Sequence, residues 1–261
     1  MNATHDQKRN RLFIVLSGIF ITNALVAEMI GVKIFSAEAT LGLSPVHLNI
    51  FGNIMDFNLT AGAVIWPVVF ITSDLINEYF GRPGVKRISY LTAILIAYAF
   101  IVIFVTIRLS PADFWLEGYG KDNAGNYFNM DYAFNTIFGQ GQRIIVGSLT
   151  AFLIGQLVDA FFFHKLKKMT GSKMLWLRST GSTLISQLID SFVVLYIAFA
   201  GIFEQDVLIA IAVTNYIYKF SVAILLTPVI YFGHYIIDRY LGKGYATEII
   251  TESNKDNEKF F

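Results

Sequence analysis

Long apolar runs alternate with short polar connections along most of the chain. The clearest run, Ile88–Ile107, has 20 residues and no charged side chain. As a helix it is long enough to cross a hydrocarbon core of roughly 30 Å. Five further runs have membrane length and contain one or more polar groups: about Leu12–Ile30, Leu59–Phe80, Ile144–Phe163, Leu175–Phe203 and Val207–Ile237. The pattern predicts an all-α membrane protein with six transmembrane helices.

Basic residues gather at alternate ends of these runs, whereas the intervening loops are poor in Lys and Arg and lean acidic. Short cytoplasmic connections are enriched in Lys and Arg, so the basic ends are expected to face the cytoplasm. Both termini are then cytoplasmic, as an even number of helices requires. The basic groups are Lys8, Arg9 and Arg11; Arg82, Lys86 and Arg87; Lys165, Lys167, Lys168 and Lys173; and Arg239 and Lys243.

Three segments lie outside the main runs. Phe35–Asn58 is too polar and too rich in glycine for a span, and its LNIFGNIMDFNL stretch favours a hairpin or a short re-entrant element. The basic N-terminus precedes an apolar run without a small-residue cleavage pattern, so we expect it to remain as helix one. Residues 1–242 are predicted to form the transmembrane domain, and 243–261 a disordered, polar cytoplasmic tail.

Composition supports a membrane setting and excludes several kinds of chemistry. Hydrophobic residues make up 55% of the 261 residues and charged residues 15%, against roughly 25% charged in soluble domains. The net charge of +1 provides no field for binding nucleic acid. The chain has 0 cysteines, and its four histidines are scattered without ligand spacing, so no metal site and no cofactor is expected.

Two similar strings lie 31 residues apart: QLVDAF at Gln156–Phe161 and QLIDSF at Gln187–Phe192. Consecutive spans run in opposite directions, so the two copies are expected to be related by an approximate two-fold axis in the membrane plane. Small residues share a helix face with each aspartate and allow close helix packing. One interpretation is a tight helix pair with Gln and Asp as interhelical hydrogen-bonding groups. The other is a binding site where the two copies meet.

Six charged side chains lie within the predicted helices, away from the helix starts where Arg143 and Arg178 lie: Glu28, Asp74, Glu78, Asp159, Asp190 and Lys219. A charge near the bilayer centre costs roughly 2.5–3.5 kcal/mol, so pairing, protonation or a wet cavity must offset so many of them. We therefore expect a polar pathway or binding site. Lys219 lies too far from either end of its run to reach water easily, and an ion pair with one of the aspartates is expected.

Other polar and aromatic positions have two interpretations each. Asp74 and Glu78 face one side of a helix, although Glu78 also fits a helix end solvated by headgroup water. Asn23 fits a hydrogen bond between helices as well as it fits a ligand contact. Four aromatic side chains lie near the polar positions and suit stacking on a flat ring, with ordinary packing as the alternative: Trp66, Phe70, Tyr216 and Tyr218.

Four stretches carry a resemblance to a known family. They are WPVVFITSDLINEYFG at Trp66–Gly81, Arg143 followed by GQLVD at Gly155–Asp159, GSTLISQLIDSF at Gly181–Phe192, and NYIYK at Asn215–Lys219. In this order and spacing they resemble the queuosine-precursor transporter family, also described as putative vitamin-uptake transporters. The likeness extends from Asn23 to about Pro228.

The resemblance implies a six-helix carrier of the bacterial inner membrane that imports 7-deazaguanine bases, the cyano or aminomethyl precursors of queuosine in tRNA. Its partners are then this small molecule and the lipid bilayer. The long outer loop Ala112–Asn135 looks larger than typical of the family and has no assigned role. Gln187 lies on the fifth predicted helix, at a position where the family pattern accepts an amide side chain. The resemblance implies substrate-binding roles for Asn23, Asp74, Glu78, Arg143, Gln156, Asp159, Ser182, Asp190 and Lys219.

The chemistry of such a base fits these residue types independently. A deazaguanine presents a ring N–H beside an exocyclic amine, which one carboxylate accepts together, while its carbonyl needs a donor from Gln, Arg or Lys. Charge-assisted hydrogen bonds of roughly 1.5–3 kcal/mol each favour a guanine-like base over adenine.

Rival functions remain at this point. One is the substrate-binding subunit of an energy-coupling-factor transporter, which needs a separate ATPase because the chain contains no Walker sequence. Another is an intramembrane aspartyl hydrolase using Asp159 and Asp190, although its expected GxGD motif is absent, as are GxSxG and HExxH. The last is a membrane scaffold, disfavoured by the buried charge. The sequence favours a transporter and no enzymatic activity.

Overall fold

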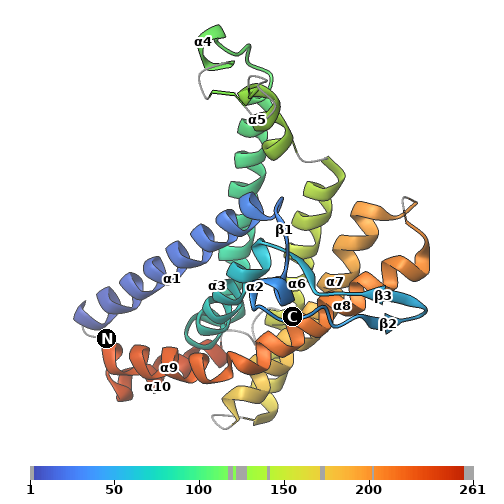
Figure 1. Cartoon of the computed structure of the whole chain (residues 1–261). Coiled ribbons are helices and arrows are strands. Elements are labelled where there is room, and N and C mark those ends of the chain that lie inside the picture. The colour runs from blue at the N-terminus through green and yellow to red at the C-terminus, as the bar shows by residue number, and fades with distance from the viewer. Residues whose placement is uncertain are drawn as a thin grey trace.

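The computed structural model describes residues 3–116, 120–121, 128–139, 142–170, 174–201 and 203–255. Long helices dominate it (Figure 1), and the chain forms two small antiparallel ribbons after the first long helix and before the second. The helices are α1 (Ala3–Ile30), α2 (Ala37–Thr40), α3 (Gly62–Thr106), α4 (Asp113–Leu116), α5 (Met130–Phe138), α6 (Gln142–Thr170), α7 (Leu175–Phe199), α8 (Gln205–Leu225), α9 (Thr227–Leu241) and α10 (Lys243–Lys255). The strands are β1 (Ile34–Ser36), β2 (Leu48–Ile50), β3 (Asn53–Met55) and β4 (Asn58–Thr60).

Five helices are long and apolar enough to cross a membrane: α1, α3, α6, α7 and α8. They agree with an all-α membrane protein, and large apolar side chains are exposed on them, as lipid-facing surfaces require: Ile14, Ile94, Tyr98, Ile101, Ile154 and Ile224 are examples.

Helix α3 contains two of the predicted runs. It has 45 residues and is interrupted at Gly81, where φ is 65° and ψ is −174°. An L residue is strained at this positive φ, so glycine permits the break. Pro83 follows and removes a further backbone N–H from the helical pattern. The helical parts of the runs Leu59–Phe80 and Ile88–Ile107 thus lie on either side of Gly81, and the first begins at Gly62, after strand β4.

The last predicted run, Val207–Ile237, is not one helix, and that prediction is wrong. Helix α8 ends at Leu225 and α9 begins at Thr227 with a proline in its first turn. Pro228 lacks the N–H that would continue the α8 ladder and suits a helix start. The apolar composition is continuous across this point, so hydropathy alone could not show the boundary.

The segment between α1 and α3 contains the predicted hairpin. Strands β2 and β3 pair from Leu48 opposite Met55, and β1 pairs with β4. Glu38 holds the segment together, because its carboxylate accepts hydrogen bonds from the Phe57 N–H at 2.8 Å and the Ser36 hydroxyl at 3.2 Å. The Phe57 backbone bond is the main reason that the pKa of Glu38 is lowered.

The C-terminal segment is a helix and not the disordered tail expected from Lys243 onwards. Tyr245, Ala246 and Ile249 of α10 are buried, and α10 packs against α3 and α9. These apolar residues form one stripe of a helix whose average composition is polar. Residues 256–261 lie outside the described part of the chain.

The core and the helix contacts place the centre of the molecule between α1, α3, α6 and α7. Phe20 of α1 and Val69, Ile76 and Tyr79 of α3 are fully buried. The most extensive packing is between α6 and α7. The N-terminal end of α1 lies beside the C-terminal helices (Figure 1), where the Lys8 ammonium donates to the Tyr240 carbonyl at 3.2 Å.

Candidate functional site

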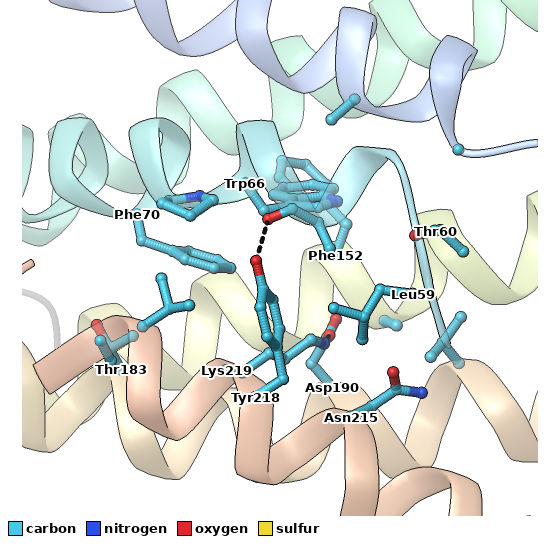
Figure 2. Close-up of a pocket in the computed structure, with 18 of the residues that line it drawn as sticks. Leu59, Thr60, Trp66, Phe70, Phe152, Thr183, Asp190, Asn215, Tyr218 and Lys219 are labelled. Carbon is cyan, nitrogen blue, oxygen red and sulfur yellow. Dashed lines mark hydrogen bonds and ion pairs between the residues drawn. The ribbon is translucent and has the colours of Figure 1, made fainter. Parts of the chain in front are cut away.

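A cavity of about 410 Å³ lies between α1, α3, α6, α7 and α8, with residues of β1 and β4 at one end. Its volume falls within the roughly 300–1,000 Å³ of small-molecule sites. Figure 2 shows α3 and α8 on opposite sides of this space, with labelled side chains from both pointing into it.

Aromatic side chains form one wall. Trp66 and Phe70 lie one turn apart on α3, with ring centroids 5.8 Å apart and planes inclined by 20°. Phe152 of α6 lies 5.7 Å from Trp66. From the other side, the Tyr218 hydroxyl donates to the Ala63 carbonyl at 3.4 Å (Figure 2). This wall provides flat apolar surface on which a planar ring can stack.

An ion pair lies on the α7–α8 side of the cavity. The Lys219 ammonium donates to the Asp190 carboxylate at 2.5 Å, and each side chain is about one fifth exposed. Of the three partners that the sequence allowed for Lys219, the structure selects Asp190. The pair satisfies two charges within the membrane helices while both remain accessible from the cavity.

Asp74 lines the end of the cavity towards Glu78. The Ser179 hydroxyl of α7 donates to its Oδ2. Its Oδ1 has no hydrogen-bond partner in the described part of the chain, although the residue is only 3% exposed. A buried carboxylate oxygen without a donor is costly unless water or a ligand supplies one.

The two amides of the repeat line a smaller cavity of about 30 Å³, which shares Trp66, Asp190 and Lys219 with the large one. Gln156 accepts a hydrogen bond from the Ser73 hydroxyl at 2.8 Å. The Gln187 Oε1 is buried without a hydrogen-bond partner among the described residues.

Glu28 of α1 also lines the cavity and was not among the candidate site residues. Both of its carboxylate oxygens accept from the Ser148 hydroxyl of α6, at 2.6 and 2.7 Å. The sequence offered one indication of a role for Glu28, which is that it is a charged residue within the first predicted helix. Phe152 and Asn215 also line the cavity. Asn215 belongs to the NYIYK string, whereas no sequence feature distinguished Phe152 from other apolar helix residues.

Glu78 lies in an ion-pair cluster and not in the cavity. It is 1% exposed, and the Arg178 guanidinium donates to both of its oxygens at 2.7 and 3.0 Å. The Lys167 ammonium lies 3.3 Å from its carboxylate and donates to its carbonyl at 2.9 Å. The carbonyl also accepts from Ser253 of α10 at 3.0 Å. Glu78 thus joins α3, α6, α7 and α10 and is not the water-solvated helix end that one interpretation expected.

The remaining candidates lie outside the cavity lining or cannot be placed. Asp159 accepts hydrogen bonds from Ser182, Thr183 and Ser186 across the α6–α7 interface, the shortest at 2.9 Å from Ser182. Asn23 donates within α1 to the Ile19 carbonyl at 2.8 Å. Tyr216 packs edge-on against Phe220. The Arg143 side chain lies outside the described residues.

A family described as "Putative vitamin uptake transporter" matches residues 60–233. The chain belongs to this family. Similar proteins are the "Probable queuosine precursor transporter" of Bacillus subtilis (strain 168), 30% identical over 188 residues that cover 71% of this chain and 76% of the relative, and the "Queuosine precursor transporter" of Escherichia coli (strain K12), 30% identical over 176 residues, 66% of this chain and 71% of the relative. A third, the "Probable queuosine precursor transporter" of Haemophilus influenzae (strain ATCC 51907 / DSM 11121 / KW20 / Rd), is 26% identical over 85% of this chain and 86% of its own length. No solved structure matches the chain.

The range matched by the vitamin uptake transporter family contains most of the cavity. It includes the aromatic wall, Asp74 and the Asp190–Lys219 pair, and it begins after α1 and therefore omits Glu28. Family membership together with five apolar helices makes the chain a multi-pass membrane protein with a transport role.

Proposed function

We propose that the protein imports queuosine precursors, 7-deazaguanine bases in the cyano or aminomethyl form, across the bacterial inner membrane. The observation that carries the proposal is a cavity with an aromatic wall opposite an ion pair, in a chain whose relatives are named as transporters of these compounds. A flat base stacks on Trp66 and Phe70, and its polar edge reaches the Asp190–Lys219 pair.

The proposed contacts follow from the chemistry of the base. The ring N–H and exocyclic amine are donors, and Asp190 or the free Oδ1 of Asp74 accepts them. The carbonyl of the base is an acceptor, and Lys219 is the cationic donor in the described lining of the cavity. Gln156 and Gln187 in the adjoining small cavity contact the base edge that extends beyond the ion pair. An adenine base reverses this donor and acceptor pattern and leaves the groups unpaired.

We further propose six membrane crossings with both termini in the cytoplasm. The break at Gly81 divides α3 into two segments, each of membrane length. The chain ends support an even number of crossings because they meet: Arg9 of α1 lies 3.6 Å from Glu252 of α10. The Gln156 and Gln187 copies then belong to an inverted pair of helices, α6 and α7.

Uptake by the purified protein in liposomes tests the function. Radiolabelled deazaguanine base should enter liposomes that contain this chain alone, and a proton gradient across the bilayer shows whether uptake is energised. Uptake that requires an added ATPase module would identify the chain as a substrate-binding subunit of an energy-coupling-factor system. Empty liposomes and liposomes with the Asp190→Asn variant provide the baseline.

A further inference from the structure

Acceptor groups outnumber donors in the charged lining of the cavity. Among the described residues that form it, Glu28, Asp74 and Asp190 are acids and Lys219 is the single base. Lys219 is committed to Asp190 by their 2.5 Å contact. The cavity therefore has two carboxylates more than its one ion pair satisfies.

Neither of these two carboxylates has a cationic partner in the part of the chain that the structure describes. The hydrogen-bond donor to Glu28 is the Ser148 hydroxyl, and the donor to Asp74 is the Ser179 hydroxyl. One neutral hydroxyl shared by both oxygens of Glu28 leaves most of its lone pairs open. Acids within membrane helices normally face a counter-charge or a substrate path.

The two acids differ in their surroundings. Asp74 is almost fully buried, with one oxygen lacking a donor, so a neutral N–H of a base suits it. Glu28 is half-buried and lines the cavity, as do Gly31, Ile34 and Leu59. An ammonium on a short flexible arm suits this position, because it retains part of its hydration while it binds the carboxylate.

We propose that the cavity selects a cationic ligand: a planar base bearing a primary ammonium on a short arm, with Glu28 as the residue that holds the ammonium. This inference rests on the proposed function and deepens it, because it selects the aminomethyl over the cyano precursor. The base lies on the aromatic wall between Trp66 and the Asp190–Lys219 pair (Figure 2). Ser148 fixes the orientation of the Glu28 carboxylate and is a positioning residue.

The test measures equilibrium binding of three ligands to the purified protein: the aminomethyl base, the cyano base, and an N-acetylated aminomethyl base that keeps the arm and loses the charge. The wild type should bind the aminomethyl base at least about ten-fold more tightly than either neutral form, which is the size of one charge-assisted contact. Equal affinities for the three ligands would overturn the inference. This comparison uses the wild-type protein alone, so it does not depend on the folding of a variant.

The variant Glu28→Gln keeps the size and a polar contact to Ser148 but removes the charge. In this variant the ratio of the affinity for the aminomethyl base to that for the cyano base should fall close to one. The affinity for the cyano base itself should change less than about two-fold. Ser148→Ala keeps the charge of Glu28 but removes the hydroxyl that orients its carboxylate, so the preference should fall by less than in Glu28→Gln. Glu204→Gln, which removes an exposed acid before α8, is the matched control and should leave all three affinities unchanged.

Two results would contradict the assignment of Glu28. A preference that survives in Glu28→Gln would place the ammonium elsewhere. Loss of pH-dependent transport for both bases, with their affinity ratio unchanged, would assign Glu28 to a coupled proton. If the wild type binds neither base, the proposed function fails, and that outcome differs from binding both bases equally.

Discussion

At the scale of single residues, the acids of the membrane helices divide by their partners. Glu78 and Asp159 are enclosed by protein donors, whereas Asp190 and Asp74 face the cavity. Spacing predicted that these acids lie inside helices and that Lys219 needs a counter-charge. Spacing could not predict which of these carboxylates accepts hydrogen bonds from a neighbouring helix, because the Ser and Arg donors are distant in sequence. Glu28 was missed as a site residue for the same reason.

The first prediction concerns Asp190 and Asp159. Asp190→Asn should lose uptake but still insert into the membrane, because the variant removes the negative charge from this side of the cavity and leaves Lys219 without its counter-charge. Asp159→Asn is the control and should retain equilibrium binding, since Asp159 is not among the described residues of the cavity lining and its carboxylate accepts hydrogen bonds from α7 hydroxyls. Uptake and binding are measured on purified, monodisperse protein. Normal uptake by Asp190→Asn would remove this residue from the site.

The second prediction concerns Lys219 and the driving force. We propose that a ligand that binds the Asp190 carboxylate weakens its bond to Lys219 and that this exchange links ligand binding to proton transfer. Lys219→Arg keeps the pair but cannot release a proton at accessible pH, so it should bind ligand without gradient-driven accumulation. Lys219→Met should also fail to accumulate ligand. Uptake is measured at two external pH values, and pH-dependent accumulation by the Arg variant would make Lys219 a structural partner only.

At the scale of elements, the apolar runs predicted α1, α6 and α7 because each is one continuous helix with polar ends. The prediction was wrong at Pro228, where apolar composition continues across a helix boundary. It was also wrong for α10, because its few apolar residues become a helix face only against α3. Hydropathy measures length and composition, and it does not measure the surface that another element supplies.

The third prediction concerns the Glu78 cluster, which connects four helices. Arg178→Met should destabilise the protein by ~3–5 kcal/mol, because it leaves a buried carboxylate with fewer counter-charges. The double variant Glu78→Gln/Arg178→Met should recover little of the loss, because it leaves the buried Lys167 ammonium without its carboxylate partner. Thermal unfolding in detergent measures both. A single variant as stable as the wild type would show that Lys167 alone satisfies Glu78.

At the scale of the whole molecule, the meeting of the chain ends and the separate halves of α3 support a six-crossing topology. The Lys and Arg distribution predicts that the shared side is cytoplasmic. The ring stack of His5 on Tyr245, with centroids 4.3 Å apart, holds the same two chain ends together.

The fourth prediction tests this topology in cells. A reporter that is active only in the periplasm should stay silent when it is fused after Lys243, and an equivalent fusion in the loop after α3, at Asp113, should be active. The two fusions control for each other's expression. A periplasmic signal from the Lys243 fusion would contradict either the number of crossings or their orientation.

The central claim is that this cavity carries a guanine-like base across the membrane. The most direct measurement is the entry of radiolabelled 7-deazaguanine base into liposomes that contain only this protein, with unlabelled guanine-like and adenine-like bases as competitors. We expect uptake above that of empty liposomes, suppressed by the guanine-like competitor and unaffected by the adenine-like one. Absence of uptake by folded protein, or equal suppression by both competitors, would contradict it.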